Sequence, residues 1–393
     1  METIDKNRLF LASCLALITT AMTFAIRARL ETVFGPEGVG LTLEQIGYAF
    51  TPAFWGFTLA MIIGGPLVDT LGIKKITWIA FVTHAIGIIW TLLATSMTSL
   101  FMATLFVGIG NGMVEAALNP MIASMYSENK TKMLNRFHVW FPGGIVIGSL
   151  AGYIIMDVMG LGWQAMVSVL FIPVIIYGAL FYGQKFPLTE RVQLGISKEK
   201  MVSSLGKPLF LFMVFCMFLT AASELGTTQR IESLLKTSVE SPLLVLAFIN
   251  GIMALGRLSA GRVVHKLKPS GMLLYSAIFT LAGLQLLTIT SGGMTFVAAT
   301  VFALGVTFFW PTMLAFVAEY LPETGALGLS IMGGAGMLSV SIVLPIMGKL
   351  MDNADASEAL ITMSILPAIL IVCFIGLNFY MKKKKLLKIK LLQ

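Results

Sequence analysis

Long apolar runs alternate with short polar connections along almost the whole chain. Most of these runs are about 20 residues or longer, the length that an α-helix needs to cross roughly 30 Å of hydrocarbon. In lipid the backbone must satisfy its own hydrogen bonds, so runs of this length predict helices. We therefore predict an all-α membrane protein with twelve transmembrane helices, over residues 9–30, 43–68, 76–95, 100–126, 134–158, 162–182, 208–229, 242–263, 271–290, 294–321, 325–351 and 358–381.

The longest polar connection falls near the middle and leaves six predicted helices on each side. The two sides look related, because Pro120 and Pro311 each precede a Gly-Gly pair by 22 or 23 residues. Two parallel pseudo-repeats with a site between them near the bilayer midplane are typical of transporters. The predicted parts are an N-terminal six-helix bundle, a cytoplasmic linker, a C-terminal six-helix bundle and a basic tail: 1–183, 184–207, 208–381 and 382–393.

Composition excludes several classes of protein. The 393 residues are 57% hydrophobic and only 12% charged, whereas soluble proteins carry about 25% charged residues. The net charge of +8 lies in the connections and the tail, not in a basic domain, so we expect no nucleic-acid partner. The three cysteines lie within apolar runs, which predicts no disulfide framework, metal site or cofactor: Cys14, Cys216 and Cys373.

The placement of Lys and Arg predicts the orientation. Most of these 27 residues fall on one side of the membrane if the N-terminus is inside, and cytoplasmic loops carry such an excess. We expect a multi-pass protein of the cell (inner) membrane with both termini cytoplasmic. The N-terminal run has no small-residue cleavage pattern, so we expect it to stay as the first helix. The basic tail is expected to contact anionic lipid headgroups.

The connection between the second and third predicted helices carries a recognisable motif. It reads GPLVDTLGIKK and contains Gly65, Asp69, Gly72 and Lys74. This resembles the cytoplasmic loop motif of the major facilitator superfamily, which implies a twelve-helix transporter fold and a conformational gating role for these residues. Glycine allows a close helix approach and a sharp turn, and Asp69 can cap a helix or pair with a cation across the half. Arg257, in GRLSAG, is expected to act in gating in the same manner.

The fourth helix carries a polar stripe within an apolar segment. Asn111, Glu115 and Asn119 are spaced four residues apart, which places them on one helical face. Together with Leu134-Asn135 and FPGG at 141–144, they resemble the fucose–galactose–glucose:proton symporter family. In that resemblance His138 stands where the fucose permease branch has a Gln, and Glu224 is similar to a Glu of the family's seventh helix.

Glu115 is the strongest candidate for a functional site. A carboxyl group in a low dielectric favours its neutral form, which makes it a reversible proton carrier; the alternative is a structural Glu paired permanently with an Arg. Asn111 and Asn119 either face the same cavity or join helices by hydrogen bonds. His138 is either a switch near working pH or a neutral side chain bonded to a backbone carbonyl. His84, in the third helix, is expected to pack.

Two arginines suggest a second kind of ligand. Arg27 and Arg230 lie late in the first and seventh helices, which the repeat relates. Two guanidiniums facing one cavity would hold a carboxylate or phosphate; the alternative is that both extend to the interface. Asn250 and Trp310 are expected to line the second half of the cavity, with Trp310 offering a face on which a sugar ring can stack.

These residues predict a secondary active transporter. We expect proton-coupled symport of a sugar or sugar-like solute by alternating access, carried out by a monomer whose partners are the solute, protons and lipid. An organic anion or acidic sugar held by Arg27 and Arg230 is the alternative substrate. A membrane-embedded transferase is the remaining alternative, but the sequence has no Ser elbow, metal cluster or acyltransferase-type His-Asp pair, so we do not expect an enzyme. It also has no phosphate-binding loop for ATP.

Overall fold

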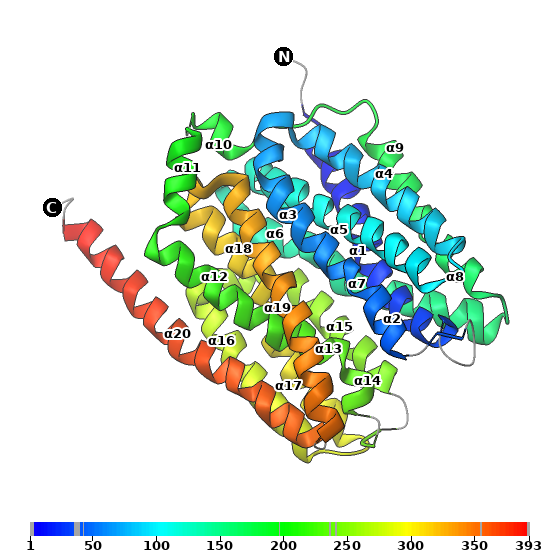
Figure 1. The fold of residues 1–393 in the computed structure, drawn as a ribbon. Helices are drawn as coiled ribbons and strands as arrows, with labels where there is room; N and C mark the ends of the chain where they lie inside the picture. Colours follow the sequence, from blue (N-terminus) through cyan, green and yellow to red (C-terminus); the bar gives the residue numbers. More distant parts are fainter. Residues whose placement is uncertain are drawn as a thin grey trace.

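The computed structural model describes residues 4–34, 40–41, 43–195, 197–235, 237–239, 242–353 and 356–390. These residues form helices and their connections, with no strand among them (Figure 1). The helices of the N-terminal half are α1 (Lys6–Phe34), α2 (Leu43–Phe50), α3 (Pro52–Leu71), α4 (Ile73–Leu92), α5 (Met97–Met125), η1 (Ser127–Asn129), α6 (Lys130–His138), α7 (Trp140–Gly152), η2 (Tyr153–Val158), α8 (Trp163–Ser168) and α9 (Phe171–Phe181).

Two short helices of the connecting segment, α10 (Glu190–Gln193) and α11 (Lys198–Leu205), lie near the N-terminus at the top of Figure 1. We call this end of the bundle the linker face. The helices of the C-terminal half are α12 (Pro208–Ala221), η3 (Ala222–Gly226), α13 (Thr227–Gln229), α14 (Ile231–Leu234), α15 (Pro242–Leu258), α16 (Ala260–Ile289), α17 (Met294–Val306), α18 (Phe309–Tyr320), η4 (Pro322–Thr324), α19 (Gly325–Asn353) and α20 (Ala356–Lys390).

The described helices have the length and composition of membrane spans. Eleven segments are long and apolar enough to cross a bilayer, and a shorter apolar helix, Leu244–Leu258, supplies the twelfth. Large apolar side chains also face outward, with Ile289 80% and Val372 71% exposed, as expected of surfaces that contact lipid. The prediction of an all-α protein with twelve transmembrane helices is confirmed.

Small residues set the spacing of the helices that carry the candidate site. A Cβ atom added to Gly108 would lie 2.4 Å from the Ala53 carbonyl oxygen, and one added to Gly112 would lie 2.4 Å from that of Phe57. The backbones of α3 and α5 therefore touch, as small residues allow in membrane helices. This contact fixes the position of α5, which carries the predicted polar stripe.

The two halves meet along a close seam between α3 and α19. A Cβ added to Gly65 would lie 2.7 Å from the Cβ of Ser330, and one added to Gly333 would lie 2.3 Å from the Cε of Met61. The Thr58 hydroxyl donates across the same seam to the Gly334 carbonyl at 3.4 Å. The two helices, one from each half, thus pack closely at these glycines.

Candidate functional site

The polar stripe of α5 is buried and continues into α6. Asn111 and Asn119 are fully buried and Glu115 is 2% exposed. The Asn119 amide donates to Glu115 Oε2, and its oxygen accepts from His138 Nε2 at 3.0 Å. His138 Nε2 lies 3.9 Å from Glu115 Oε2. The structure therefore brings three of the predicted residues into one hydrogen-bonded cluster; its part in transport stays a prediction.

Two prolines free backbone carbonyls beside this cluster. Proline lacks an N–H, so Pro142 leaves the His138 carbonyl, four residues earlier, without its helical partner. Pro311 does the same to the Thr307 carbonyl. The Arg257 guanidinium receives both, because Nη1 donates to His138 O at 2.8 Å and Nε donates to Thr307 O at 2.6 Å. Arg257, on α15 of the C-terminal half, is thereby bonded to α6 of the N-terminal half.

Arg257 also holds a buried carboxylate. Its Nη2 lies 3.3 Å from Glu224 Oε1, and the Arg257 and Glu224 side chains are 1% and 4% exposed. Glu224 sits in the π-helical turn η3, a local widening often found at functional sites. Its second oxygen, Oε2, is buried and has no hydrogen-bond partner among the described residues. The sequence predicts gating for Arg257 and a site role for Glu224, and the structure places the two side chains together; both roles remain predictions.

A second polar network extends from the other end of the stripe. Tyr177 Oη lies 3.0 Å from His84 Nδ1, and His84 Nε2 lies 2.9 Å from Asn111 Oδ1. The Asn111 amide then donates to Thr23 Oγ1 at 3.0 Å. His84 does pack, as expected, but it also orients Asn111. Tyr177 was missed because its partner lies 93 residues away; the only signal in the sequence was an imidazole within an apolar helix.

The two predicted anion-binding arginines have different surroundings. The Arg27 guanidinium lies 4.7 Å and 4.5 Å from the ring centroids of Phe24 and Phe54, a cation–π arrangement, and Nη2 reaches Gln229 Oε1 of the other half at 3.5 Å. Arg230 instead donates from Nη2 to the Leu344 carbonyl at 3.3 Å. These contacts go to different helices, so a joint anion site stays a prediction.

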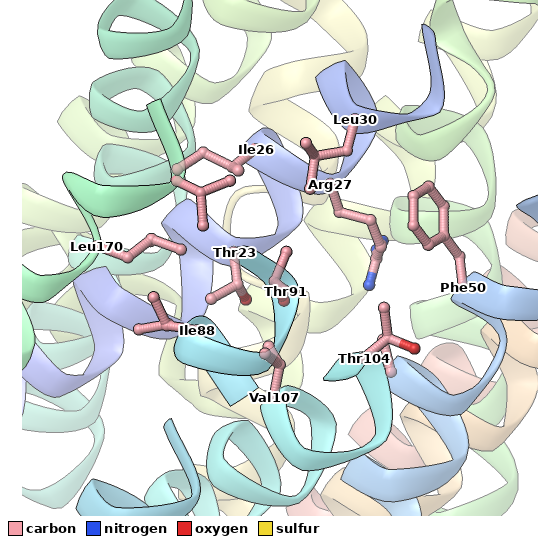
Figure 2. Close-up of a pocket in the computed structure, with 12 residues that line it drawn as sticks. Thr23, Ile26, Arg27, Leu30, Phe50, Ile88, Thr91, Thr104, Val107 and Leu170 are labelled. Carbon is pink, nitrogen blue, oxygen red and sulfur yellow. The ribbon is translucent and has the colours of Figure 1, made fainter. Parts of the chain in front are cut away.

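Figure 2 shows Arg27 at a small cavity inside the N-terminal half. The hydroxyl-bearing side chains of Thr23, Thr91 and Thr104 line it together with apolar side chains. Its volume is about 30 Å³, which suits about one water molecule. This cavity is too small for a sugar.

A much larger cavity, of about 480 Å³, lies between the two halves. This volume falls in the range of small-molecule sites. Helices α1 and α7 with η2 line one side, and α13, α14 and α15 line the other. Its lining residues are Phe24, Ala25, Ala28, Arg29, Ile145, Gly148, Ser149, Leu150, Gly152, Tyr153, Asp157, Thr228, Gln229, Ile231, Leu244, Leu246, Ala247 and Asn250.

Asn250 is the one predicted solute-binding residue among those lining residues. Its amide donates to the Leu246 carbonyl at 2.9 Å. Trp310 is 7% exposed, and a Cβ added to Gly336 of α19 would lie 2.6 Å from its ring. In this conformation the indole therefore packs against α19, and its predicted stacking on a sugar remains untested.

The loop motif joins the linker segment to the N-terminal half. Arg191 Nε contacts Asp69 Oδ2 at 2.6 Å, and the Thr189 hydroxyl donates to the other carboxylate oxygen. Gly72 ends α3 with φ of +87°, a left-handed conformation that suits glycine. Lys74 is exposed. Asp69 thus has a cationic partner, supplied by α10; the gating role of the motif stays a prediction.

Further contacts close the linker face between the halves. Lys130 of α6 pairs with Glu190 at 2.6 Å and donates to the Ala318 carbonyl of α18 at 3.0 Å. The Thr131 backbone and hydroxyl both donate to Glu319. These contacts join the first turn of α6 to the end of α18. The two halves are therefore joined by polar contacts at the linker face, while the large cavity lies between the halves nearer the opposite face.

Two bundles of membrane-length helices that enclose a solute-sized cavity define a secondary transporter architecture. The chain belongs to the Major Facilitator Superfamily, whose family model matches residues 9–293, well over half of its length. This confirms the superfamily resemblance of the loop motif. It also indicates a transporter rather than an enzyme.

Individual relatives are distant. The D-galactonate transporter of Escherichia coli O6:H1 is 26% identical over 126 residues, covering 32% of this chain and 29% of that protein. The chain thus matches less than a third of that relative's length. The E. coli fucose:proton symporter shares the fold, with a TM-score of 0.75, 16% identity and coverage of 93% and 97%. A human organic anion transporter gives a TM-score of 0.73 at 13% identity, covering 95% and 100%.

Proposed function

We propose that this protein is a proton-coupled symporter that moves a sugar or sugar-like solute by alternating access. The observation that carries the proposal is the burial of Glu115 on α5, hydrogen-bonded to Asn119 and adjacent to His138. An ionisable side chain within a membrane bundle is costly and typically marks a proton or substrate pathway. Relatives that transport fucose with protons, or galactonate, support the same class of function.

The solute is proposed to bind in the cavity between the halves, where Asn250, Gln229 and Ser149 supply polar groups. Proton and solute enter from the open side, the halves rock, and both leave on the other side. Moving one charge through 100 mV supplies about 2.3 kcal/mol, which corresponds to roughly fortyfold accumulation at about 1.4 kcal/mol per factor of ten.

The proposed orientation places both termini and the linker face in the cytoplasm, because most Lys and Arg residues lie on that side. The linker face, where the halves are joined, is then cytoplasmic, and the large cavity belongs to the outward-facing half of the cycle. Import as a monomer, in the cell inner membrane, is part of the same proposal.

The test is uptake of labelled sugars into vesicles that contain the purified protein and carry an imposed proton gradient. Glu115→Gln removes the proton carrier with little change in shape, so gradient-driven accumulation should fall to the level of empty vesicles. Glu128→Gln is the matched control, because Glu128 is exposed at the linker face. Unaltered proton-driven accumulation in Glu115→Gln would refute the proposal.

An organic anion, such as a sugar acid, is the second candidate substrate. Arg27 is 9% exposed and reaches Gln229, which lines the large cavity, so a small shift brings its charge to a bound carboxylate. The relatives named for galactonate and for organic anions favour the same class. If this candidate is right, the protein binds a sugar acid at least tenfold tighter than the neutral sugar. Arg27→Gln should abolish this preference, whereas the exposed control Arg136→Gln should keep it.

A further inference from the structure

Three charge-bearing side chains meet in the buried region where the halves join. Glu115, Glu224 and Arg257 are 2%, 3% and 2% exposed. The ion pair is formed by Arg257 and Glu224, at 3.3 Å. Glu115 is close enough to Arg257 for an electrostatic interaction, yet its hydrogen bond comes from the neutral Asn119 amide. One guanidinium thus interacts with two carboxyl groups and is bonded to one of them, that of Glu224.

We propose that Glu224 serves as the counter-ion of Arg257 and thereby leaves Glu115 protonated, and that Arg257 shifts from the His138 carbonyl to Glu115 when that proton leaves. The inference rests on the proposed function and deepens it. It assigns one transported proton per cycle and identifies Arg257 as the residue that senses the loss of this proton. Glu224 acts through Arg257, so it is a positioning residue rather than a proton carrier.

The net charge of the cluster supports the first part of the proposal, that Glu115 is protonated while Glu224 balances Arg257. A guanidinium stays charged in proteins, so one of the two carboxylates balances it and the other leaves the cluster with a net negative charge. An uncompensated charge in a buried site is strongly unfavourable, and adding a proton removes it. The ion pair already occupies Glu224, so this proton belongs on Glu115. The cluster is then neutral.

The other titratable groups around the cluster among the described residues do not supply the charge that would neutralise it. The His138 ring, from α6, donates from Nε2 to the Asn119 side-chain oxygen. His84, from α4, is held by Asn111 and Tyr177 on the far part of the stripe. Among the described residues, Arg257 is the cation that interacts electrostatically with both Glu115 and Glu224.

The hydrogen-bond donors of Arg257 support the second part of the proposal, that Arg257 shifts to Glu115 when the proton leaves. A guanidinium has five N–H donors, and Arg257 uses one each from Nε, Nη1 and Nη2. Nη1 is bonded to the carbonyl of His138, whose ring lies 3.9 Å from Glu115 Oε2. A carboxylate acceptor makes a hydrogen bond roughly twice as strong as a neutral carbonyl does. Once Glu115 loses its proton to water on the open side, it therefore competes for Nη1.

This exchange has a mechanical consequence. The bond from Arg257 to the His138 carbonyl crosses between the halves, and Pro142 prevents the helix from supplying another donor to that carbonyl. When Nη1 turns to Glu115, α6 loses this tie to α15. Proton release thus moves a contact between the halves from α6 to α5, and reprotonation returns it to α6.

The test is pH-difference infrared spectroscopy of the purified protein in lipid vesicles, which detects neutral carboxyl groups directly. The wild type should show one buried neutral-carboxyl band at neutral pH, and Glu115→Gln should remove it. A band that survives in Glu115→Gln belongs to another carboxyl group and would overturn the proposal. This comparison does not depend on how any Glu224 variant folds.

Glu224→Gln then isolates the counter-ion role. Arg257 is left with Glu115 as its carboxylate partner, so Glu115 should ionise and the band should disappear at neutral pH. In the double variant Glu224→Gln/Arg257→Gln both charges are gone, and the band should return. A merely structural ion pair would leave the band unchanged in Glu224→Gln, and that outcome would overturn the inference. Glu128→Gln serves as the matched control.

The proposed function and the role assigned to Glu224 and Arg257 would be refuted by different results. If wild-type vesicles do not accumulate solute in response to a proton gradient, the proposed function fails, whatever the infrared bands show. If they do accumulate solute but the Glu224→Gln band persists, proton coupling stands and the role assigned to Glu224 and Arg257 is wrong.

Discussion

The ion pair between Asp69 and Arg191 makes a strong prediction about how the linker face stays closed. The two side chains are 1% and 8% exposed, with Nε and Oδ2 2.6 Å apart. Asp69→Asn keeps the shape of the side chain but leaves the Arg191 charge without its buried partner. Removing one member of a buried pair costs about 3–5 kcal/mol, and this cost applies only to the conformation in which the pair is formed.

The conformation with a closed linker face should therefore become less populated, and the conformation with an open linker face more populated. A penalty of about 3 kcal/mol shifts a two-state equilibrium by roughly a hundredfold. The distance between spin labels at Lys132 and Lys266, both exposed, measures this equilibrium in a chain whose three native cysteines have been replaced. Asp69→Asn should convert a mainly short distance distribution into a mainly long one.

The matched control is Glu323→Gln, at the same face. Glu323 pairs with Lys207, and their side chains are 18% and 49% exposed, so this pair is worth at most about 1 kcal/mol. Its loss should leave the distribution close to that of the wild type. If Asp69→Asn has no larger effect than Glu323→Gln, the buried pair does not hold the face closed.

Two further variants test local structure by their thermal unfolding. Gly72→Ala should destabilise the protein by about 1–2 kcal/mol, because φ is +87° at this position, although no atom lies within 4 Å of an added Cβ. The control Gly293→Ala should be neutral, because φ is −60° there and the space around an added Cβ is equally open. Equal unfolding midpoints for the two variants would refute the strain argument. His84→Leu should destabilise the protein by about 2–6 kcal/mol, because Asn111 and Tyr177 each lose a buried partner worth about 1–3 kcal/mol. A cost below about 0.5 kcal/mol would show that the network relaxes around the change.

The helical architecture could be predicted from the sequence because hydrocarbon thickness imposes a length on every span. The end of the eighth span differs from its predicted position. We predicted 242–263, but α15 ends at Leu258, and a turn at Ser259 begins α16. The boundary was hidden because Gly, Ser and Ala continue the apolar pattern without a strong breaker. The predicted division into 1–183 and 208–381 stays a prediction of domain boundaries.

The candidate site could be predicted only in part. Four-residue spacing was enough to place Asn111, Glu115 and Asn119 on one face, since such neighbours depend on helix geometry alone. Arg257 was harder, because its acceptors lie 50 and 119 residues away. Those acceptors are free only because two prolines interrupt other helices. No local pattern in GRLSAG predicts a tertiary contact of this kind. The sequence therefore suggested a gating role for Arg257 but not its hydrogen-bond partners.

The seam between α3 and α19 also bears on the size of the cargo. Gly65 and Gly333 bring α3 and α19 close together at this seam, so we expect these two helices to stay in contact when the halves move relative to one another. Widening then falls to the opposite margin, where α7 and α15 flank the large cavity. We expect the bulk of Tyr153 and Leu244 at that margin, rather than any polar group, to set the upper limit on the molecules that pass.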